Sequence, residues 1–568
     1  MTATAPLPAS TPPAARAVPL AIGTPQFADA ALAEPARTQG AAAAWQAAFE
    51  QHGARAAAGV TGDFAVGVVD ATGRSWLAVD RFAVRTLCYR LHDGRLQYAE
   101  RADAWSADGA ELDPQAIFDY LFFHAIPSPR TIFKGVYRLP PGHCARFENG
   151  QLTVSTYWVP EFTERARGTS FDALRSEFRG LLRDAVGARL DGGKAACFLS
   201  GGTDSSTVAG MIREASGAPA HTYSIGFEAE GYDEMAFARI AAKHFGAAHH
   251  EYYVTPDDLV AGIGDVARHY DQPFGNSSAL PAYYCARMAR EDGVTRLLAG
   301  DGGDELFGGN TRYAKQRVFG WYDALPGAVR RGVMEPFFGL SAVARTPLLK
   351  KGSSYIEQAK VPMPERLQMY NLLLRLGLAE VLTPGFLAQV DPAGPGRQQR
   401  QVWDAARADS LVNRMLAYDW RYTLAETDLP KVRGTTQLAG VEVAYPFLDD
   451  RLLAFSLALP TDHKLKGLKL RWFFKEALRG FLPDEIITKK KQGFGLPFGV
   501  WAMRHPALKK LAADSLASLA TRGIVRPEFI TSLIDRRLPE HPGYYGEMVW
   551  ILMMMEQWMQ GHAPSYRF

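Results

Sequence analysis

A glycine-rich turn at residues 200–206 carries hydroxyl and carboxyl groups directly after an apolar run. The sequence from residue 197 to 211 reads CFLSGGTDSSTVAGM. The apolar run predicts a buried strand, and the small and aliphatic residues that follow at helical spacing predict a helix. Serine hydroxyls and the free N–H groups of a helix N-terminus can bind phosphate oxygens. The turn therefore indicates a phosphate site, and a serine-capped turn without a ligand is the alternative that these residues alone leave open.

Asp204 distinguishes this turn from the common nucleotide loops. No lysine follows the glycines at the spacing of GxxxxGK[ST], and the pattern GxGxxG is not present in the turn. A carboxylate beside phosphates is repelled unless a divalent cation lies between them. Asp204 therefore predicts that Mg²⁺ binds with the phosphates.

A second turn of the same kind lies about a hundred residues later. Residues 297–309 read LLAGDGGDELFGG, in which Asp301, Asp304 and Glu305 follow an apolar run. In a doubly wound fold, loops at the carboxyl ends of neighbouring parallel strands face one crevice. We expect Asp204 and Asp304 to share one Mg²⁺–pyrophosphate there.

The elements that position these turns change character between residues 160 and 170. Before this point, short strand-like runs flank the hairpin signals DATGR and ENGQ, which predicts a β-rich domain at residues 19–160 after a flexible leader at 1–18. After it, apolar runs alternate with helices, as in a parallel sheet, and the pattern is mostly helical beyond Asn310. Residues 170–568 are therefore expected to form a larger α/β domain.

Composition narrows the classes of partner. The 63 basic and 60 acidic residues give a net charge of +3, which does not favour nucleic acid as a partner. The apolar run at residues 548–555 is far shorter than the ~20 residues of a membrane span, and a buried terminal helix is expected instead. Four scattered cysteines form no CxxC pair, which fits a reducing cytoplasm.

Several segments resemble one family in their order and spacing. SGGTDSS is similar to the SGGxDSS pyrophosphate loop of the N-type ATP pyrophosphatases, and GDGGDELFGG, YPFLDDRLLAF and LPDEIITKKKQGFGLP resemble segments of asparagine synthetases. The resemblance covers nearly the whole chain after about residue 60. It implies a glutaminase-like β-rich sandwich followed by a doubly wound ATP pyrophosphatase domain with helical additions. It also implies ATP and Mg²⁺ as cofactors, and amide formation through an acyl-adenylate with release of pyrophosphate.

The resemblance also implies roles for single residues. Contacts to AMP would come from Leu199, Ile225, Ala299 and Gly300, and the pyrophosphate loop would comprise Ser200, Gly201, Gly202, Asp204, Ser205 and Ser206. Asp204 and Asp304 would hold the metal. Lys491 would stabilise charge on the adenylate, although a solvated basic turn is the alternative for residues 489–491. Asp301 would orient or deprotonate the amine. Asp428 and Glu442 are further catalytic candidates, with a structural ion pair as the alternative for Glu442.

The N-terminal region departs from the glutamine-dependent members of that family. Those enzymes begin with a cysteine that attacks glutamine, whereas this chain begins MTATAPLPAS and has no cysteine before Cys88. No counterpart of the family's NGE segment occurs between residues 19 and 59, and the family's Arg-Asp-Arg turn begins here with Val79. We therefore predict that glutamine is not hydrolysed.

The substrates stay open at this point. Arg433 and Ala444 depart from the family pattern in segments that flank the synthetase pocket, so neither the acid nor the acceptor is identified. An ammonia-using ligase acting on aspartate or another small-molecule or peptide carboxylate is one hypothesis. An intramolecular cyclase of the β-lactam synthetase or lasso-peptide kind, which uses a substrate amine and could need partner proteins, is the second. A non-catalytic nucleotide-binding scaffold is the third, and a homodimer remains open for each.

Overall fold

The computed structural model describes residues 19–109, 111–165, 169–323, 325–339, 347–490 and 495–568. The chain forms two compact units. The first contains the described residues up to Ile117, with Ile126–Trp158 and Tyr270–Pro273, and the second contains Phe118–Ala125, Val159–His269 and Phe274–Phe568. The leader predicted at residues 1–18 and the candidate Lys491 lie outside the described residues.

The first unit is built on two antiparallel sheets. One has the strand order β1-β4-β5-β9-β10 and the other the order β7-β6-β8. The predicted hairpin at residues 70–74 joins β4 to β5, where Asp70 Oδ1 accepts hydrogen bonds from the backbone N–H groups of Thr72 and Arg74. The strands are β1 (Leu20–Gly23), β2 (Gln26–Phe27), β3 (Val60–Thr61), β4 (Phe64–Val69), β5 (Ser75–Val79), β6 (Cys88–His92), β7 (Arg95–Ala99), β8 (Tyr137–Arg138), β9 (His143–Glu148) and β10 (Gln151–Thr156).

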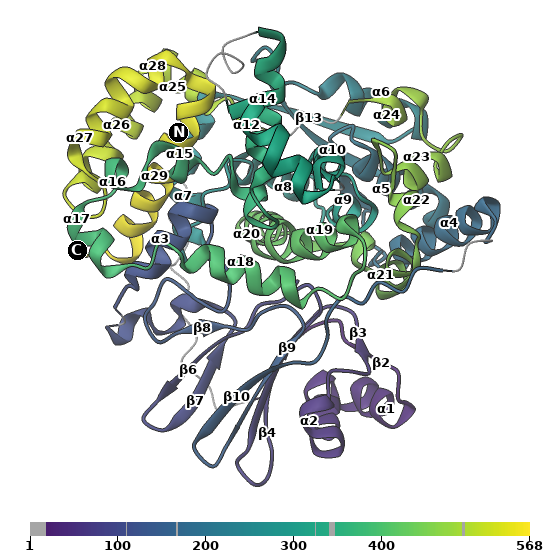
Figure 1. Ribbon diagram of the computed structural model, residues 1–568. Helices are drawn as coiled ribbons and strands as arrows, with labels where there is room; N and C mark the ends of the chain where they lie inside the picture. The colour runs from purple at the N-terminus through teal and green to yellow at the C-terminus, as the bar shows by residue number, and fades with distance from the viewer. Residues whose placement is uncertain (1–18, 110, 166–168, 324, 340–346, 491–494) are drawn as a thin grey trace, which may run out of the picture. The chain divides into compact units, whose positions relative to one another are not determined.

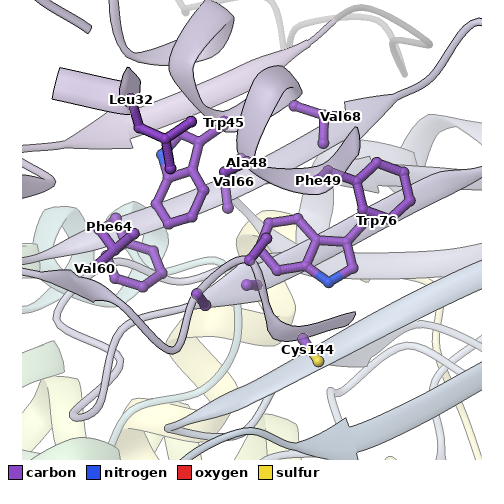
Figure 2. Close-up of a cluster of buried hydrophobic side chains, with 13 residues drawn as sticks. Leu32, Trp45, Ala48, Phe49, Val60, Phe64, Val66, Val68, Trp76 and Cys144 are labelled. Carbon is purple, nitrogen blue, oxygen red and sulfur yellow. The ribbon is translucent and has the colours of Figure 1, made fainter. Parts of the chain in front are cut away.

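Both faces of the five-stranded sheet are covered. One face packs against residues of the three-stranded sheet, so that Leu77 of β5 and Tyr98 of β7 share a buried cluster. The other face packs against α1 (Ala30–Gln39) and α2 (Ala41–His52), which lie beside each other in the purple part of Figure 1. Figure 2 shows Trp45 of α2 against Trp76 of β5, with ring centroids 5.7 Å apart. This layered β-rich sandwich confirms the fold class expected for the N-terminal region.

The second unit contains a parallel sheet with the strand order β13-β12-β11-β14-β15. The chain builds outward from β11 in one direction as far as β13, and then resumes on the other side of β11 with β14. The order therefore reverses between β11 and β14, which makes this point the topological switch of a doubly wound sheet. The strands are β11 (Ala196–Phe198), β12 (His221–Phe227), β13 (Ala248–Val254), β14 (Arg296–Leu298) and β15 (Glu442–Ala444). The fold class expected for this region is confirmed.

Helices pack on this sheet through apolar stripes. In α4 (Phe171–Gly187), Leu174, Phe178 and Leu182 recur every fourth residue and are buried, while Ser170 caps the helix by accepting from the N–H of Ala173. The helices near the sheet and the cavity include α5 (Thr203–Ser216), α6 (Met235–Phe245), α7 (Pro256–His269), α8 (Ala279–Glu291), α9 (Gly303–Phe307), α19 (Leu411–Asp419), α20 (Leu429–Ala439), α21 (Asp450–Ala458), α23 (Trp472–Ala477) and α24 (Asp484–Thr488).

Further helices complete the second unit. The predicted terminal helix is present as α29 (Pro542–His562), in which residues 548–559 are buried. No helix among the described residues is long and apolar enough to cross a membrane. Other helices are α3 (Pro114–Phe123), which is divided between the two units, α10 (Thr311–Asp323), α11 (Gly327–Val329), α12 (Glu335–Gly339), α14 (Pro347–Lys360), α15 (Leu372–Leu376), α16 (Leu378–Val381), α17 (Pro384–Gln389), α18 (Gly394–Ala405), α22 (Thr461–Lys464), α25 (Phe498–Arg504), α26 (Pro506–Ala520), α27 (Pro527–Ser532) and α28 (Leu538–Glu540).

A π-helical segment, η5 (Trp420–Asp428), connects α19 directly to α20. Such segments are rare and occur often at functional sites. Here the segment ends at Asp428, and Lys431 follows in the first turn of α20. The π-helical segment therefore fixes where these two charged side chains lie.

Candidate active site

A cavity of about 390 Å³ lies at the carboxyl ends of β11 and β14, at the topological switch of the sheet. Ligands of open α/β sheets bind at this position. Apolar residues line it from β11, β12 and α8, and charged residues line it from the turn after β14 and from α20. The lining residues are Phe198, Leu199, Ser200, Gly202, Asp204, Ser205, Tyr223, Ile225, Asn276, Ser278, Pro281, Ala282, Cys285, Gly300, Asp301, Gly302, Asp304, Glu305, Asp428, Lys431 and Val432.

The turn after β11 is held by its own hydroxyl groups. Ser205 Oγ accepts from the backbone N–H of Ser200 at 3.1 Å and lies 3.1 Å from Ser200 Oγ. Gly201 has φ +68°, and a Cβ there would overlap backbone atoms of Phe237 and Ala238. Helix α5 then begins at Thr203, and its N-cap Gly202 has no side chain to satisfy the first N–H groups. The N-terminus of α5 therefore lies at the cavity, where an anion would bind.

The two glycine-rich turns touch each other. A Cβ on Gly300 would lie 3.0 Å from Cβ of Asp204 and 3.0 Å from the backbone nitrogen of Ser205. Glycine at position 300 therefore allows the second turn to approach the first. As a result, the carboxylates of Asp204 and Asp304 lie close enough to bind one cation.

Arg471 is the cation that joins these carboxylates in the structure. Its Nη1 donates to Asp204 Oδ2 at 2.7 Å, to Asp304 Oδ1 at 2.7 Å and to Thr203 Oγ1 at 2.9 Å, and its Nη2 donates to Asp204 Oδ1. The residue is buried, with 4% of its surface exposed. Burial disfavours the charged guanidinium, but Asp204 and Asp304 outweigh that effect and raise the pKa of Arg471.

A second charged group is formed by Asp301, Asp428 and Lys431. Lys431 Nζ lies 2.9 Å from Asp428 Oδ1 and 3.8 Å from Asp301 Oδ1. Burial, with a smaller contribution from the Asp428 carboxylate, raises the pKa of Asp301 to about 6 against the lowering effect of the Lys431 ammonium group. A carboxyl group with this pKa can accept a proton near neutral pH.

Most of the predicted site residues line the cavity. Of the predicted site residues, Leu199, Ser200, Gly202, Asp204, Ser205, Ile225, Gly300, Asp301, Asp304 and Asp428 line the cavity. Gly201, Ser206 and Ala299 do not line it: Gly201 packs against α6, Ser206 is buried within α5, and the N–H of Ala299 donates to the carbonyl of Ala444. Lys491 lies outside the part of the chain that is described.

Glu442 is not brought to the cavity. It begins β15 and pairs in register with Arg296, the first residue of β14, so both side chains lie at the amino ends of parallel strands. The cavity lies at the carboxyl ends. Glu442 Oε2 accepts from Arg296 Nη2 at 2.8 Å, and its side chain is 70% exposed. The structure therefore places Glu442 away from the cavity, in an ion pair that agrees with its structural alternative.

Sequence patterns missed several residues at the site. Lys431 follows Asp428 by three positions, the spacing at which helical side chains meet, and this signal could have found it. Asn276 and Ser278 come from the loop before α8 and carry no recognisable motif. Arg471 is separated from Asp204 by 267 positions, so only the fold brings them together.

Lys489 is not the solvated residue that three adjacent lysines suggest. Its side chain is 8% exposed, its Nζ lies 3.1 Å from Glu234 Oε1, and it lies 4.4 Å from the ring centroid of Phe237. The same ammonium group donates to the carbonyl of Gly201 at 3.5 Å. The solvated-turn alternative is therefore wrong for Lys489, which contacts the first glycine-rich turn.

The donors at Asp204 and Asp304 suit Mg²⁺. This ion prefers carboxylate oxygens, and it commonly uses one or two protein carboxylates together with substrate phosphates. Among the described residues, no group of three or more His, Cys, Asp or Glu side chains could hold a metal by itself. Two carboxylates that already bind one cation beside a helix N-terminus fit a metal that arrives with phosphate.

Comparison with known proteins finds two family models that match the sequence. The asparagine synthase model matches residues 177–560, and the glutamine amidotransferase domain model matches residues 30–158. Asparagine synthetase (glutamine-hydrolyzing) 1 of Bacillus subtilis is 24% identical over 490 residues, which cover 85% of this chain and 74% of that protein. Asparagine synthetase (glutamine-hydrolyzing) 3 of the same organism is 22% identical over 505 residues, with 84% and 73% covered. Amidase chry2 of Gibberella zeae is 24% identical over 491 residues, with 80% and 72% covered.

Proposed function

This chain belongs to the asparagine synthase family, and we propose that it activates a substrate carboxylate as an acyl-adenylate and passes the acyl group to a nitrogen nucleophile. The family establishes an ATP-dependent amide ligase in general terms. The observation that carries the finer proposal is the contact of two acidic glycine-rich turns beside a separate Asp301–Lys431 pair in one cavity.

The proposed reaction has two steps. A carboxylate oxygen of the substrate attacks the α-phosphorus of ATP, and the bond to the β-phosphate oxygen breaks to release pyrophosphate. The nitrogen nucleophile then attacks the acyl carbon, AMP leaves with the carbon–oxygen bond electrons, and the nitrogen loses a proton. Asp301 would accept that proton, since burial raises its pKa to about 6.

Different parts of the cavity would contact different parts of the nucleotide. Phe198, Tyr223 and Ile225 belong to or pack against one apolar cluster and would contact the base. The N-terminus of α5 and the serines of the first turn would contact pyrophosphate oxygens. Mg²⁺ bound by Asp204 and Asp304 would neutralise phosphate charge, and Lys491 would stabilise the adenylate.

We further propose that the nitrogen does not come from glutamine hydrolysed by this chain. All four cysteines are buried, and the one that lines the cavity, Cys285, belongs to α8 of the second unit and not to the glutaminase-like region. The space between the two sheets of the first unit is filled by apolar side chains such as Leu77, Leu96 and Tyr98, and Leu20 of β1 packs against them. On this proposal residues 19–160 form a glutaminase-like domain without that activity, and residues 170–568 form the ligase domain. Ammonia or a substrate amine supplies the nitrogen, and the amine case corresponds to an intramolecular cyclase.

Product analysis tests the proposal even before the acid is identified. The protein is incubated with ATP, Mg²⁺, ammonia and a panel of amino acids and carboxylated peptides, and phosphorus NMR follows the nucleotide. We expect AMP and pyrophosphate, whereas ADP and phosphate would contradict the proposal. Asp304→Asn should lower the rate by about 10²-fold or more, since a charge-neutralising group is lost. Asp265→Asn, at an exposed position on α7, is the matched control.

Two further readouts separate the alternatives. Glutamate release from glutamine should stay at the level of the buffer, and steady release would contradict the loss of glutaminase activity. Mass spectrometry of the product then identifies the nitrogen donor. Replacement of a hydroxyl by an amide nitrogen indicates ammonia, and loss of one water from a single substrate indicates cyclisation. ATP binding without turnover on any substrate would favour the scaffold.

A further inference from the structure

Arg471 lies at the place where a bridging cation would bind. Its Nη1 is 2.7 Å from Asp204 Oδ2 and 2.7 Å from Asp304 Oδ1. Mg²⁺ takes oxygen ligands at about 2.1 Å. Nη1 fills the space beside both oxygens, where a metal ion held by the same two oxygens would need room. The guanidinium group and a bridging Mg²⁺ therefore exclude each other at these two atoms.

The carboxylates have little freedom to turn toward a second position. A Cβ on Gly303 would overlap Asp204 Oδ1, and a Cβ on Gly309 would overlap Asp304 Oδ1, so glycine backbone closes against each carboxylate. The other side of the group is closed by Phe474, whose ring centroid lies 3.9 Å from the guanidinium carbon of Arg471. A metal can reach both carboxylates only if the arginine side chain moves.

The backbone at Arg471 is held in a costly conformation. Its φ is +53°, in the left-handed region that side-chain-bearing residues rarely adopt, and it is the N-cap of α23. Such strain persists only where surrounding contacts over-determine it, and it is concentrated at sites that change state during function. The four hydrogen bonds to Asp204, Asp304 and Thr203 are contacts of this kind.

We propose that Arg471 and the divalent cation compete for Asp204 and Asp304, so that the metal enters only together with the nucleotide. Free Mg²⁺ must displace the guanidinium and leave a buried arginine without its partners, which is strongly unfavourable. A nucleotide offers the arginine phosphate oxygens in exchange, and guanidinium binds phosphate well. Arg471 thus positions the two carboxylates and makes metal binding conditional on ATP. This inference rests on the proposed nucleotide site.

Mn²⁺ is the probe, because its electron paramagnetic resonance signal distinguishes free from bound ion. Without nucleotide, the wild-type protein should leave Mn²⁺ free. At the same concentrations, the protein should bind one ion once α,β-methylene-ATP is added. This analogue cannot be cleaved between the α- and β-phosphates. Arg471→Met should bind Mn²⁺ without nucleotide at least about tenfold more tightly than the wild type. Arg479→Met, an exposed arginine paired with Glu476, should behave as the wild type.

Two results would overturn the proposal: tight Mn²⁺ binding by the wild type without nucleotide, or no gain in Arg471→Met. If that variant fails to fold, Arg471→Lys replaces it. A lysine ammonium cannot make the four bonds at once, so Mn²⁺ should raise the melting temperature of this variant more than that of the wild type. A failure of the proposed function would look different. The methylene analogue would then promote no Mn²⁺ binding in the wild type, whatever the arginine variants do.

Discussion

Lys431 Nζ lies 3.8 Å from the carboxylate of Asp301. Burial raises the pKa of this carboxyl to about 6, and the ammonium group of Lys431 acts in the opposite direction and lowers it. The ammonium group therefore favours the ionised form of the proposed general base in a buried site that disfavours it.

The rate of amide formation should fall as the pH drops through about 6, because Asp301 must be ionised to accept a proton from the amine. Asp301→Asn should lower the rate at neutral pH by about 10²- to 10⁴-fold and remove this acid limb. The measurement is a pH profile of product formation for both proteins. An unchanged acid limb in the variant would show that another group titrates.

Lys431→Met should shift the acid limb to higher pH. Burial and Asp428 raise the pKa of Asp301, and the ammonium group is the largest effect that lowers it, so its removal should leave that pKa higher. The rate at high pH should suffer less than the rate near pH 6. Lys431→Arg is the conservative control, since it retains the charge. A uniform loss of rate at every pH in the methionine variant would contradict this electrostatic role.

The ionisation of Asp301 should also change the stability of the folded protein with pH. Because its pKa in the folded protein is raised, its contribution to stability is complete below the unfolded value of about 3.9 and is lost as the pH rises through about 6. Asparagine carries no charge that burial could penalise. The melting temperature of Asp301→Asn minus that of the wild type should therefore increase from about pH 5 to about pH 8. Thermal unfolding at several pH values checks this, and a decrease would contradict it.

Glu442→Gln should leave the reaction rate within about twofold of the wild type. The side chain is 70% exposed and pairs with Arg296 at the amino ends of the strands, whereas the cavity lies at their carboxyl ends. Exposed ion pairs contribute about 0–1 kcal/mol to the free energy of unfolding, so the loss of stability should stay within that range. A large drop in rate with unchanged stability would restore Glu442 as a catalytic candidate.

The buried ion pair Arg522–Glu556 should contribute more to stability than the exposed pair Arg296–Glu442. Arg522 Nη2 donates to Glu556 Oε1 at 3.0 Å, and both side chains are almost fully buried. Arg522→Met leaves a buried carboxylate without its partner, which typically costs about 3–5 kcal/mol. Denaturation in urea should show a lower midpoint for this variant. The double variant with Glu556→Leu should recover much of the loss, and no recovery would point to a packing role of the arginine stem.

The sequence predicted the parts of the site that belong to a single recognisable sequence pattern. An apolar run followed by a glycine-rich acidic turn occurs at β11 and again at β14, and parallel strands bring such turns to one edge. The approach of Asp204 to Asp304 could therefore be expected from the residues alone. The apolar runs before the two turns form β11 and β14, as those runs predicted.

The remaining part of the site depends on contacts that no local pattern encodes. Arg471 reaches Asp204 across 267 positions and belongs to neither glycine-rich turn. Glu442 is a site candidate that the structure does not bring to the cavity, and the reason is geometric. It lies in the strand next to β14, but at the first residue of a three-residue strand, so the direction of the chain puts it at the wrong end of the sheet.

The π-helical segment Trp420–Asp428 makes this active site sensitive to a change in chain length. A helix turns by about 100° per residue, so deletion of one residue from this segment would rotate everything that follows it in α20 by that angle. Lys431 would then face a different direction, while the sheet and both glycine-rich turns would keep their sequence. A deletion of one residue here would therefore separate Lys431 from Asp301 without changing a residue of either glycine-rich turn.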